Sequence, residues 1–240
     1  MGKRKKKKSS GYLIVLIIAI GIMIYKDDIL KETYSIDNKN LLEVSYQIDS
    51  IPEYNGDSYV YINGNKPIFK EEDINTDTFE IYGALDNLGR CTYTYANLSK
   101  ELMPTKQRES IGSVKPSGWH TVKYDFIEGK YLYNRCHLIG YQLTGENVNN
   151  RNLITCTRKM NTGVMLEYEN KVANYIKKTN NHVLYRVTPI FDGDNLLAKG
   201  VLMEGMSVED RGEGLMFNIF VYNVQDGVII DYSNGESYIE

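Results

Sequence analysis

One short stretch of this chain gathers an unusual set of reactive side chains: Asn134-Arg135-Cys136-His137, then Asn152, Asn161 and Glu169. An imidazole can take a proton from water near neutral pH, and a guanidinium can hold a phosphate through two parallel hydrogen bonds. Amide and carboxylate oxygens suit a hard cation such as Mg²⁺, which keeps most of its own waters. Together these groups predict metal-assisted hydrolysis of a phosphodiester bond.

Alternating residues indicate a strand over residues 130–139, which we expect to be the central strand of the sheet. One face of this strand would carry Tyr131, Tyr133, Arg135 and His137. The other face would carry Leu132, Asn134, Cys136 and Leu138. Arg135 and His137 therefore point the same way. Packing is the expected role of the two tyrosines, and base stacking is the alternative.

The later residues of the set, Asn152, Asn161 and Glu169, are expected on or beside a strand and a helix. We expect a short strand over residues 152–157 and a helix from about Val164 to Lys178, which has apolar residues at helical spacing. In a continuous helix, Asn161 and Glu169 would lie about 12 Å apart along the axis. Both can serve one ion only if Asn161 precedes the helix, and Gly163 is expected to provide the break.

The remaining chain reads mainly as antiparallel strands, expected at residues 59–62, 91–95, 183–190, 197–206, 215–224 and 228–232. Another short strand is expected between Trp119 and Glu128. No internal repeat is visible. The sequence therefore predicts a single α+β domain over residues 51–240, mainly of antiparallel sheet.

The first 50 residues differ in composition from this domain. Six basic residues stand at positions 3–8, and an uncharged apolar run extends from Gly11 to Tyr25, roughly 22 Å long as a helix. We expect a cytoplasmic basic segment (1–10), an N-terminal transmembrane helix (11–26) and a stalk (27–50), with the rest of the chain outside the cell. A cleaved signal peptide, which would give a secreted protein, is the alternative, but no small-residue cleavage site follows Tyr25.

Charge and cysteines limit the chemistry. Of the 28 basic residues six lie before residue 26, which leaves 22 against 31 acidic residues and a net charge of −9. Any nucleic-acid site must therefore be a local basic patch. Cys136 and Cys156 flank the reactive residues and are the best candidates for a disulfide. The sequence alone cannot establish this pair, because Cys91 is a third cysteine. Zinc is not expected, because the chain has no C-x-x-C or H-x-x-x-H spacing.

The segment from Asn134 to Glu169 resembles the DNA/RNA non-specific endonuclease family, the Serratia-nuclease type of the ββα-metal superfamily. It looks closest to membrane-attached DNA-entry nucleases and streptococcal DNases. The family motif Asp-Arg-Gly-His stands here as Asn134-Arg135-Cys136-His137, and Asn152 opens the next strand. The metal-binding Asn matches Asn161, nine residues on, and a helical Glu matches Glu169, eight further. The likeness runs from about Cys91 to the C-terminus.

The resemblance implies a role for each matched residue. Asn161 would hold Mg²⁺, with Mn²⁺ as a substitute, and His137 would be the general base that activates water. Arg135 would contact the phosphate, while Glu169 and Asn152 would orient the hydrated metal or the substrate. Asn134 replaces the family Asp, so a supporting carboxylate is missing. Cys136 replaces Gly, but its side chain is expected to point away from the site.

The resemblance implies an endonuclease that cuts DNA, and RNA as a further expectation, with little sequence preference and leaves 5′-phosphate ends. Two alternatives stay open: a non-catalytic surface domain that binds nucleic acid or a protein partner, and an exported toxin nuclease. Among the other polar residues, His120 and His182 are expected to be structural. Arg108 is expected to have a surface role, and a contact with substrate phosphate is the alternative.

Overall fold

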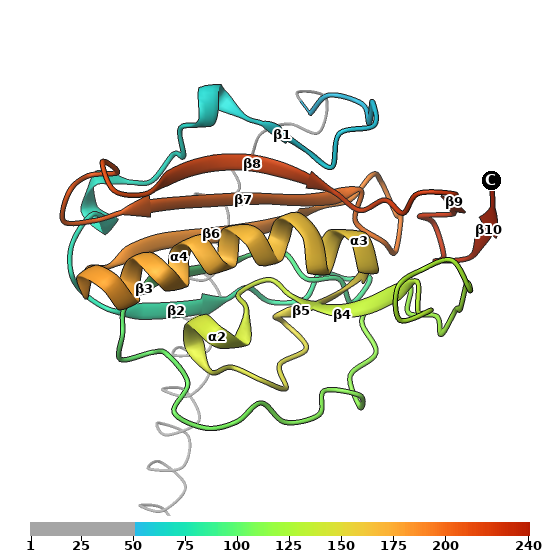
Figure 1. Ribbon diagram of the computed structural model, residues 1–240, viewed down its shortest axis with the longest axis horizontal. Helices are drawn as coiled ribbons and strands as arrows, with labels where there is room; N and C mark the ends of the chain where they lie inside the picture. Colours follow the sequence, from blue (N-terminus) through green and yellow to red (C-terminus); the bar gives the residue numbers. More distant parts are fainter. Residues whose placement is uncertain (1–50) are drawn as a thin grey trace, which may run out of the picture. The chain divides into compact units, whose positions relative to one another are not determined.

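The computed structural model describes residues 51–240 (Figure 1). The predicted basic segment (1–10), transmembrane helix (11–26) and stalk (27–50) lie outside the described residues. Within residues 51–240, no helix is long and apolar enough to cross a bilayer.

Six antiparallel strands form the main sheet in the order β1-β8-β7-β6-β3-β2. The strands are β1 (Tyr59–Tyr61), β2 (Phe79–Tyr82), β3 (Thr94–Leu98), β6 (Val183–Ile190), β7 (Gly200–Ser207) and β8 (Met216–Tyr222). Their β-branched and aromatic residues favour extended chain. The mainly antiparallel α+β fold predicted from the sequence is confirmed.

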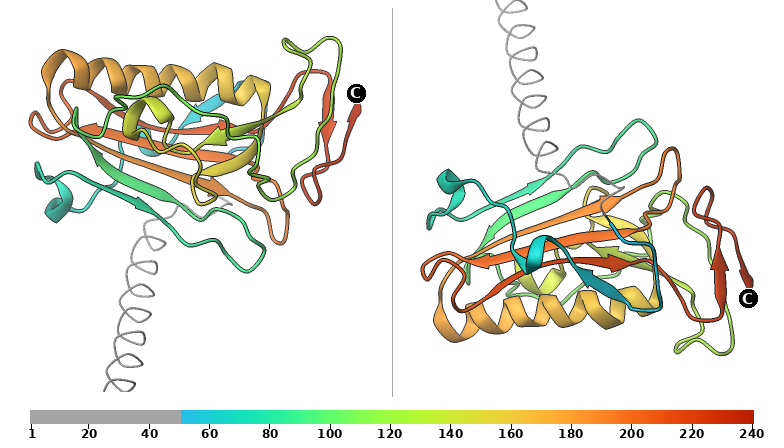
Figure 2. Two further views of the ribbon diagram at one scale, coloured as in Figure 1. Left: turned by 90° about the horizontal axis from the view of Figure 1, so that it is seen from below. Right: turned by 90° about the horizontal axis from the view of Figure 1, so that it is seen from above.

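One long helix, α4 (Leu166–Thr179), covers one face of this sheet (Figures 1 and 2). Val172, Ala173 and Ile176 pack from α4 into the main core, which includes Tyr185 and Met203 from the sheet. Strand alternation sends the neighbouring residues to the opposite face, where Leu202 and Phe220 join a second, smaller cluster. The helix ends where Asn180 adopts the left-handed conformation, with φ 59°.

Before α4 the chain makes a short helix α3 (Arg158–Met160) and then a π-helical turn (Asn161–Met165). The Thr157 hydroxyl caps α3 by accepting the Met160 N–H at 3.2 Å. Gly163 departs from helical geometry, with φ −94° and ψ −112°. The predicted break at Gly163 is therefore confirmed, and Asn161 precedes α4.

Strands β4 (Tyr133–His137) and β5 (Leu153–Thr157) form a separate two-stranded ribbon. The prediction that residues 130–139 form the central strand is wrong: β4 pairs with β5 alone. Lys130 adopts a left-handed conformation, with φ 68°, so the extended run cannot begin there. The ribbon packs beside α4 through Cys136, Ile154 and Cys156, which belong to the main core.

Short elements complete the domain. Helix α2 (Tyr141–Thr144) follows β4, and β9 (Val228–Ile230) pairs with β10 (Ser237–Ile239) near the C-terminus. Two 3₁₀ turns lie at Asn63–Asn65 and Glu71–Asp73. The strand expected between Trp119 and Glu128 is wrong, since that region contributes only an isolated bridge between Lys123 and Tyr131.

Candidate active site

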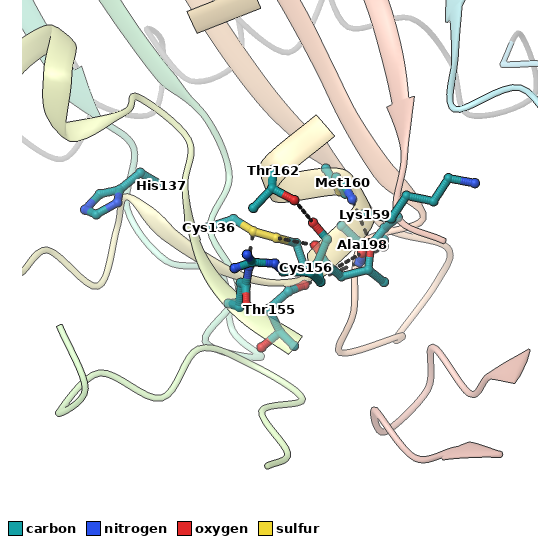
Figure 3. The surroundings of a disulfide bond; sticks show 12 residues. Cys136, His137, Thr155, Cys156, Lys159, Met160, Thr162 and Ala198 are labelled. Atoms are coloured by element: carbon teal, nitrogen blue, oxygen red, sulfur yellow. Dashed lines mark hydrogen bonds between the residues drawn. A yellow bond between two sulfur atoms is a disulfide. The ribbon is translucent and has the colours of Figure 1, made fainter. Parts of the chain in front are cut away.

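The β4–β5 ribbon carries the first part of the site. Arg135 lies opposite Thr155, and His137 lies opposite Leu153. A disulfide joins Cys136 to Cys156, with 5.9 Å between their Cα atoms, which resolves the pairing that the sequence left open. Both half-cystines are fully buried, so Cys136 points into the core as expected. Figure 3 shows the His137 ring directed away from the sulfur atoms.

His137 is 6% exposed and is oriented by a backbone carbonyl. Its Nε2 lies 3.0 Å from the Asn147 carbonyl oxygen, so Nε2 carries the proton and Nδ1 holds the lone pair. The pKa of His137 is lowered to about 4, mainly by burial and also by the nearby Arg108 charge, against the opposing effect of the Asn147 carbonyl. The imidazole is therefore neutral at physiological pH and has one atom free to accept a proton.

Arg108 is the residue that faces this free nitrogen. The Arg108 Nη2 lies 3.3 Å from His137 Nδ1, at the long end of the hydrogen-bond range. The side chain is otherwise exposed to solvent. Arg108 lies at the surface, as the sequence predicted, and the structure also brings its guanidinium to the candidate base.

Glu169 enters the site from the first turns of α4. The residue is 9% exposed, and burial raises the pKa of its carboxyl to about 8, partly offset by a Gln142 hydrogen bond and the Arg108 charge. The carboxylate lies against Gly140, where an added Cβ would come within 2.4 Å of Oε2. Only glycine at position 140 leaves room for the Glu169 carboxylate in this position.

Asn161 lies at the junction of α3 and the π-helical turn. Within residues 51–240 its side-chain amide has no hydrogen-bond partner, and the residue is partly exposed to solvent. The non-helical Gly163 separates this residue from α4. As a result, the Asn161 amide and the Glu169 carboxylate line the same cavity rather than following one another along a helix.

A cavity of about 360 Å³, here called the central cavity, brings these groups together. Its lining comes from three separate parts of the chain: Arg108, then Arg135, His137, Gly140, Tyr141 and Gln142, and then Asn161, Thr162, Leu166 and Glu169. Four of the six site residues predicted from the sequence are therefore neighbours in space.

Arg135 also lines the central cavity, but its guanidinium is already engaged. It donates to the carbonyl oxygens of Val114 and Gly112, the latter at 3.0 Å. The guanidinium carbon also lies 3.9 Å from the centre of the Trp119 ring, a cation–π arrangement. The expected phosphate contact of Arg135 would therefore use only the donors that these partners leave.

The other two predicted residues lie elsewhere. Asn152 is fully buried and forms a pair of hydrogen bonds with the Ile139 backbone: its Oδ1 accepts from the N–H at 2.8 Å, and its Nδ2 donates to the carbonyl at 3.0 Å. It fixes the chain just after His137 and is absent from the lining of the central cavity. Asn134 lines a neighbouring cavity.

Comparison with known proteins identifies the family. A family model described as DNA/RNA non-specific endonuclease matches residues 70–209. The chain belongs to this family. The match starts before Cys91 and stops short of the C-terminus, so it differs at both ends from the extent expected from the sequence. It includes all six predicted site residues and Arg108.

A curated protein is similar to this chain over much of its length. A deoxyribonuclease from Streptococcus dysgalactiae subsp. equisimilis is 26% identical over 198 residues, which cover 65% of this chain and 59% of that protein. The chain thus spans less than two thirds of that relative's length.

Solved structures of other proteins share the fold. NucA from Streptococcus agalactiae with magnesium bound has a TM-score of 0.70 at 23% identity, covering 84% of this chain and 96% of NucA. The Sda1 nuclease with bound zinc has a TM-score of 0.57 at 28% identity, covering 68% of this chain and 81% of that one.

The donors of this endonuclease-family site differ from those of a structural zinc site. No group of three or more His, Cys, Asp or Glu side chains in the described part of the chain is placed to hold a metal. A caged structural zinc needs four such ligands. The central cavity offers instead an unpartnered amide at Asn161 and a buried carboxyl at Glu169. This small oxygen set fits a hydrated Mg²⁺, which needs few protein ligands.

Proposed function

We propose that this chain is a metal-dependent endonuclease that hydrolyses phosphodiester bonds of DNA, and also of RNA. The observation that carries this proposal is the convergence of three groups on one cavity: the unprotonated Nδ1 of His137, which the Arg108 guanidinium approaches, the amide of Asn161 and the buried carboxyl of Glu169. Membership of the DNA/RNA non-specific endonuclease family supports the same reaction.

His137 is the general base. The Asn147 carbonyl holds the proton on Nε2, so Nδ1 takes the proton from the attacking water. A pKa of about 4 keeps the ring neutral but makes it a weak base. A bound phosphate would place a negative charge beside the imidazole and raise that pKa towards the range where proton transfer is efficient.

Arg108 contacts the base His137 before substrate binds and the phosphate afterwards. Its contact with Nδ1 is long, and its side chain reaches the cavity from an exposed position. An incoming phosphate would attract the guanidinium through charge-assisted hydrogen bonds, which leaves Nδ1 to a water molecule. Arg135, held by Val114, Gly112 and Trp119, provides a second positive charge in a fixed place.

Asn161 and Glu169 would hold the metal, with Asn161 as the direct ligand and Glu169 orienting the bound waters. When bound, Mg²⁺, or Mn²⁺ in its place, stabilises charge on the phosphoryl oxygens and on the leaving 3′-oxygen, so the products carry 5′-phosphates. A cation beside Glu169 would also favour ionisation of this carboxyl. The magnesium ion bound in the NucA structure is consistent with this donor set.

Low sequence preference follows from the residues that line the central cavity. Arg108 and Arg135 suit phosphate, which is the same in every nucleotide and carries no sequence information. Asn152, which is buried against the Ile139 backbone, supports the loop after His137 and acts on the reaction only through it.

The domain would act outside the cell, attached to the membrane by the apolar run at residues 11–26. The Cys136–Cys156 disulfide supports an oxidising location, since cytosolic thiols are kept reduced. If the anchor is retained, full-length protein stays in the membrane fraction with its domain open to external protease. A mature N-terminus near Lys26 would instead indicate cleavage and secretion.

Plasmid nicking by the purified full-length chain tests the function. We expect Mg²⁺-dependent nicking that EDTA abolishes, and a loss of about 10²–10⁴-fold in His137→Ala. Two other histidines provide matched controls: His120 Nε2 bonds the Asn234 carbonyl at 3.0 Å, and His182 Nδ1 bonds Glu209 at 2.7 Å, both outside the central cavity. If His120→Ala or His182→Ala removes activity from folded protein while His137→Ala does not, the base is assigned to the wrong residue.

A further inference from the structure

A second cavity, here called the side cavity, adjoins the central one and has a volume of about 450 Å³. It shares three lining residues with the central cavity: Arg108, Arg135 and Asn161. The rest of its lining comes from Ile111, Trp119, Thr121, Tyr131, Tyr133, Asn134 and Arg158. A chain whose phosphate reached His137 would therefore have a neighbouring unit at or in the side cavity.

The chemistry of the side cavity differs from that of the domain as a whole. Three arginines line it and none of its lining residues is acidic, although residues after the basic N-terminal block carry a net charge of −9. The Nε of Arg158 is buried without a hydrogen-bond partner, and its guanidinium has only a distant ion pair, 3.9 Å from the largely exposed Glu128. The cavity thus holds positive charge and an unused donor beside aromatic rings.

Tyr131 is the ring best placed to receive a flat ligand. Trp119 is half-buried, and Arg135 covers one of its faces. Tyr131 is 45% exposed and lines the cavity, while the Lys123 ammonium lies 4.6 Å over its ring on one side. The remaining face of Tyr131 is therefore available. Tyr133, in contrast, is buried and donates its hydroxyl to the Gly235 carbonyl at 3.0 Å.

Tyr131 lies two residues before the ribbon and lines the same cavity as Arg135, so one short strand can place a base at Tyr131 and a phosphate near Arg135. A base can lie on a tyrosine ring only after it has left its own stack, which an unpaired strand allows and a duplex resists.

We propose that the side cavity is a stacking subsite that takes one unpaired base against Tyr131, with Arg158 and Lys123 on the adjacent phosphates. The proposal rests on the proposed function and adds to it a substrate class: single-stranded nucleic acid, or the frayed and looped parts of duplexes. Sequence preference stays low, because every base has a face that can stack.

Kinetics on two substrates test the subsite. The measured quantity is the ratio of kcat/KM for a single-stranded oligonucleotide to kcat/KM for bis(p-nitrophenyl) phosphate, which has no base. We expect Tyr131→Ala to lower this ratio roughly 5- to 150-fold, the range found for losing one stacked base, mainly through KM. Tyr131→Phe keeps the ring and should retain the ratio. Tyr61→Ala removes a comparably exposed tyrosine on β1 and should leave it unchanged.

A binding measurement separates the subsite from catalysis. Trp119, the single tryptophan of the chain, lies in the wall of the side cavity, so its fluorescence reports occupation. In EDTA, the single-stranded oligonucleotide should quench this fluorescence at lower concentration than the matching duplex. A single abasic position moved along the oligonucleotide should weaken binding to the wild type at one place, and Tyr131→Ala should remove that dependence.

Two results would overturn the subsite: an unchanged ratio in Tyr131→Ala, or an equal fall in Tyr61→Ala. Failure of the proposed function has a different signature. In that case the wild type cleaves neither substrate with Mg²⁺, while the quenching and abasic measurements still decide whether a base binds at Tyr131.

Discussion

A buried glutamate lies on each side of the main sheet, and the two differ in their charged partners. On the face away from α4, Glu204 is fully buried, and its Oε2 accepts from Arg186 Nε at 2.7 Å. Its Oε1 accepts from the Ile68 N–H at 3.1 Å, and Arg186 donates in turn to the Ile68 carbonyl at 2.8 Å. On the α4 face, Glu169 is almost as buried but has no ion pair among the described residues.

This difference separates a structural charge from a functional one. Every oxygen of Glu204 meets a donor supplied by the protein, so the pair is complete without any ligand. Glu169 lacks such a cation, and burial raises its pKa to about 8. A bound cation would stabilise the ionised form of such a buried, neutral carboxyl. Carboxyl groups with strongly shifted pKa values are common in ligand sites.

The largest expected effect comes from exchanging each glutamate for glutamine. Glu169→Gln should lower nicking by about 10²-fold or more, because it removes charge from the metal site, and the domain should stay folded. Glu204→Gln should lower the free energy of unfolding by about 3–5 kcal/mol, because it leaves the buried Arg186 charge unpaired. Urea unfolding and activity per folded molecule measure both. The comparison fails if Glu204→Gln inactivates folded protein and Glu169→Gln unfolds it.

Gly140→Ala tests whether the position of Glu169, and not only its charge, matters. The added Cβ would come within 2.4 Å of Oε2 and must displace the carboxylate. We expect a loss of about 10- to 10²-fold in kcat, since displacements near 1 Å have such effects. The helix α2 should tolerate alanine, because Gly140 has an ordinary φ of −60°.

A double variant provides the control for Gly140→Ala. When Gly140→Ala is added to Glu169→Gln, kcat should fall little further, because both changes act on the Glu169 carboxyl. A full additional loss would mean that Gly140 serves the site by another route.

Removing the disulfide tests how much the stability of the β4–β5 ribbon depends on this covalent link, which the main sheet lacks. Cys136 and Cys156 are 20 residues apart, so replacing both by alanine should lower the free energy of unfolding by about 3 kcal/mol. Thermal melts measure the change. Cys91→Ala removes a buried thiol and keeps the disulfide, and should have a clearly smaller effect. Equal losses in both variants would assign the effect to core packing alone.

The smallest expected effect is the pH dependence of wild-type stability in EDTA. His137 has a lowered pKa of about 4, so its contribution increases stability as pH rises from about 4 to 6.5. Glu169 has a raised pKa of about 8, so its contribution decreases stability as pH rises from about 4.5 to 8. Between about pH 4.5 and 6.5 the two contributions cancel.

Substitution should reveal the cancelled contributions. Relative to wild type, Glu169→Gln should gain on the order of 1 kcal/mol of stability per pH unit in this window, and His137→Gln should lose about as much. Urea unfolding at several pH values measures the slopes. Parallel slopes in all three proteins would contradict the assigned pKa shifts.

Much of the fold followed from local pattern. The strand at residues 183–190 was predicted with the bounds it has, because a run rich in β-branched and aromatic residues is bounded by Asn181 and Asp192. The helix expected at 164–178 lies at 166–179. The prediction for residues 91–95 was displaced, and the strand is at 94–98, where partner strands on both sides decide the limits.

The errors concern information that is not local. The strands at 79–82 and 237–239 are short and gain their order from a neighbouring strand, which no sequence window reveals. Arg108 lies in an irregular segment without periodicity, so nothing in the sequence directs it towards His137. Asn152 matched a family position, yet its amide is hydrogen-bonded to the Ile139 backbone. Sequence spacing alone cannot distinguish a buried amide that supports the backbone from one that contacts a ligand.

Cys91 has a consequence for thiol–disulfide exchange. It shares the main core with the disulfide, and its Sγ donates to the carbonyls of Asn150 and Leu153, each at 3.3 Å. Burial raises the pKa of this thiol to about 12, so the folded protein contains almost no thiolate to attack the neighbouring sulfurs. Unfolding returns the thiol to a pKa of about 8.5, where exchange begins. Heat inactivation should therefore become irreversible through disulfide scrambling, and Cys91→Ala should restore refolding.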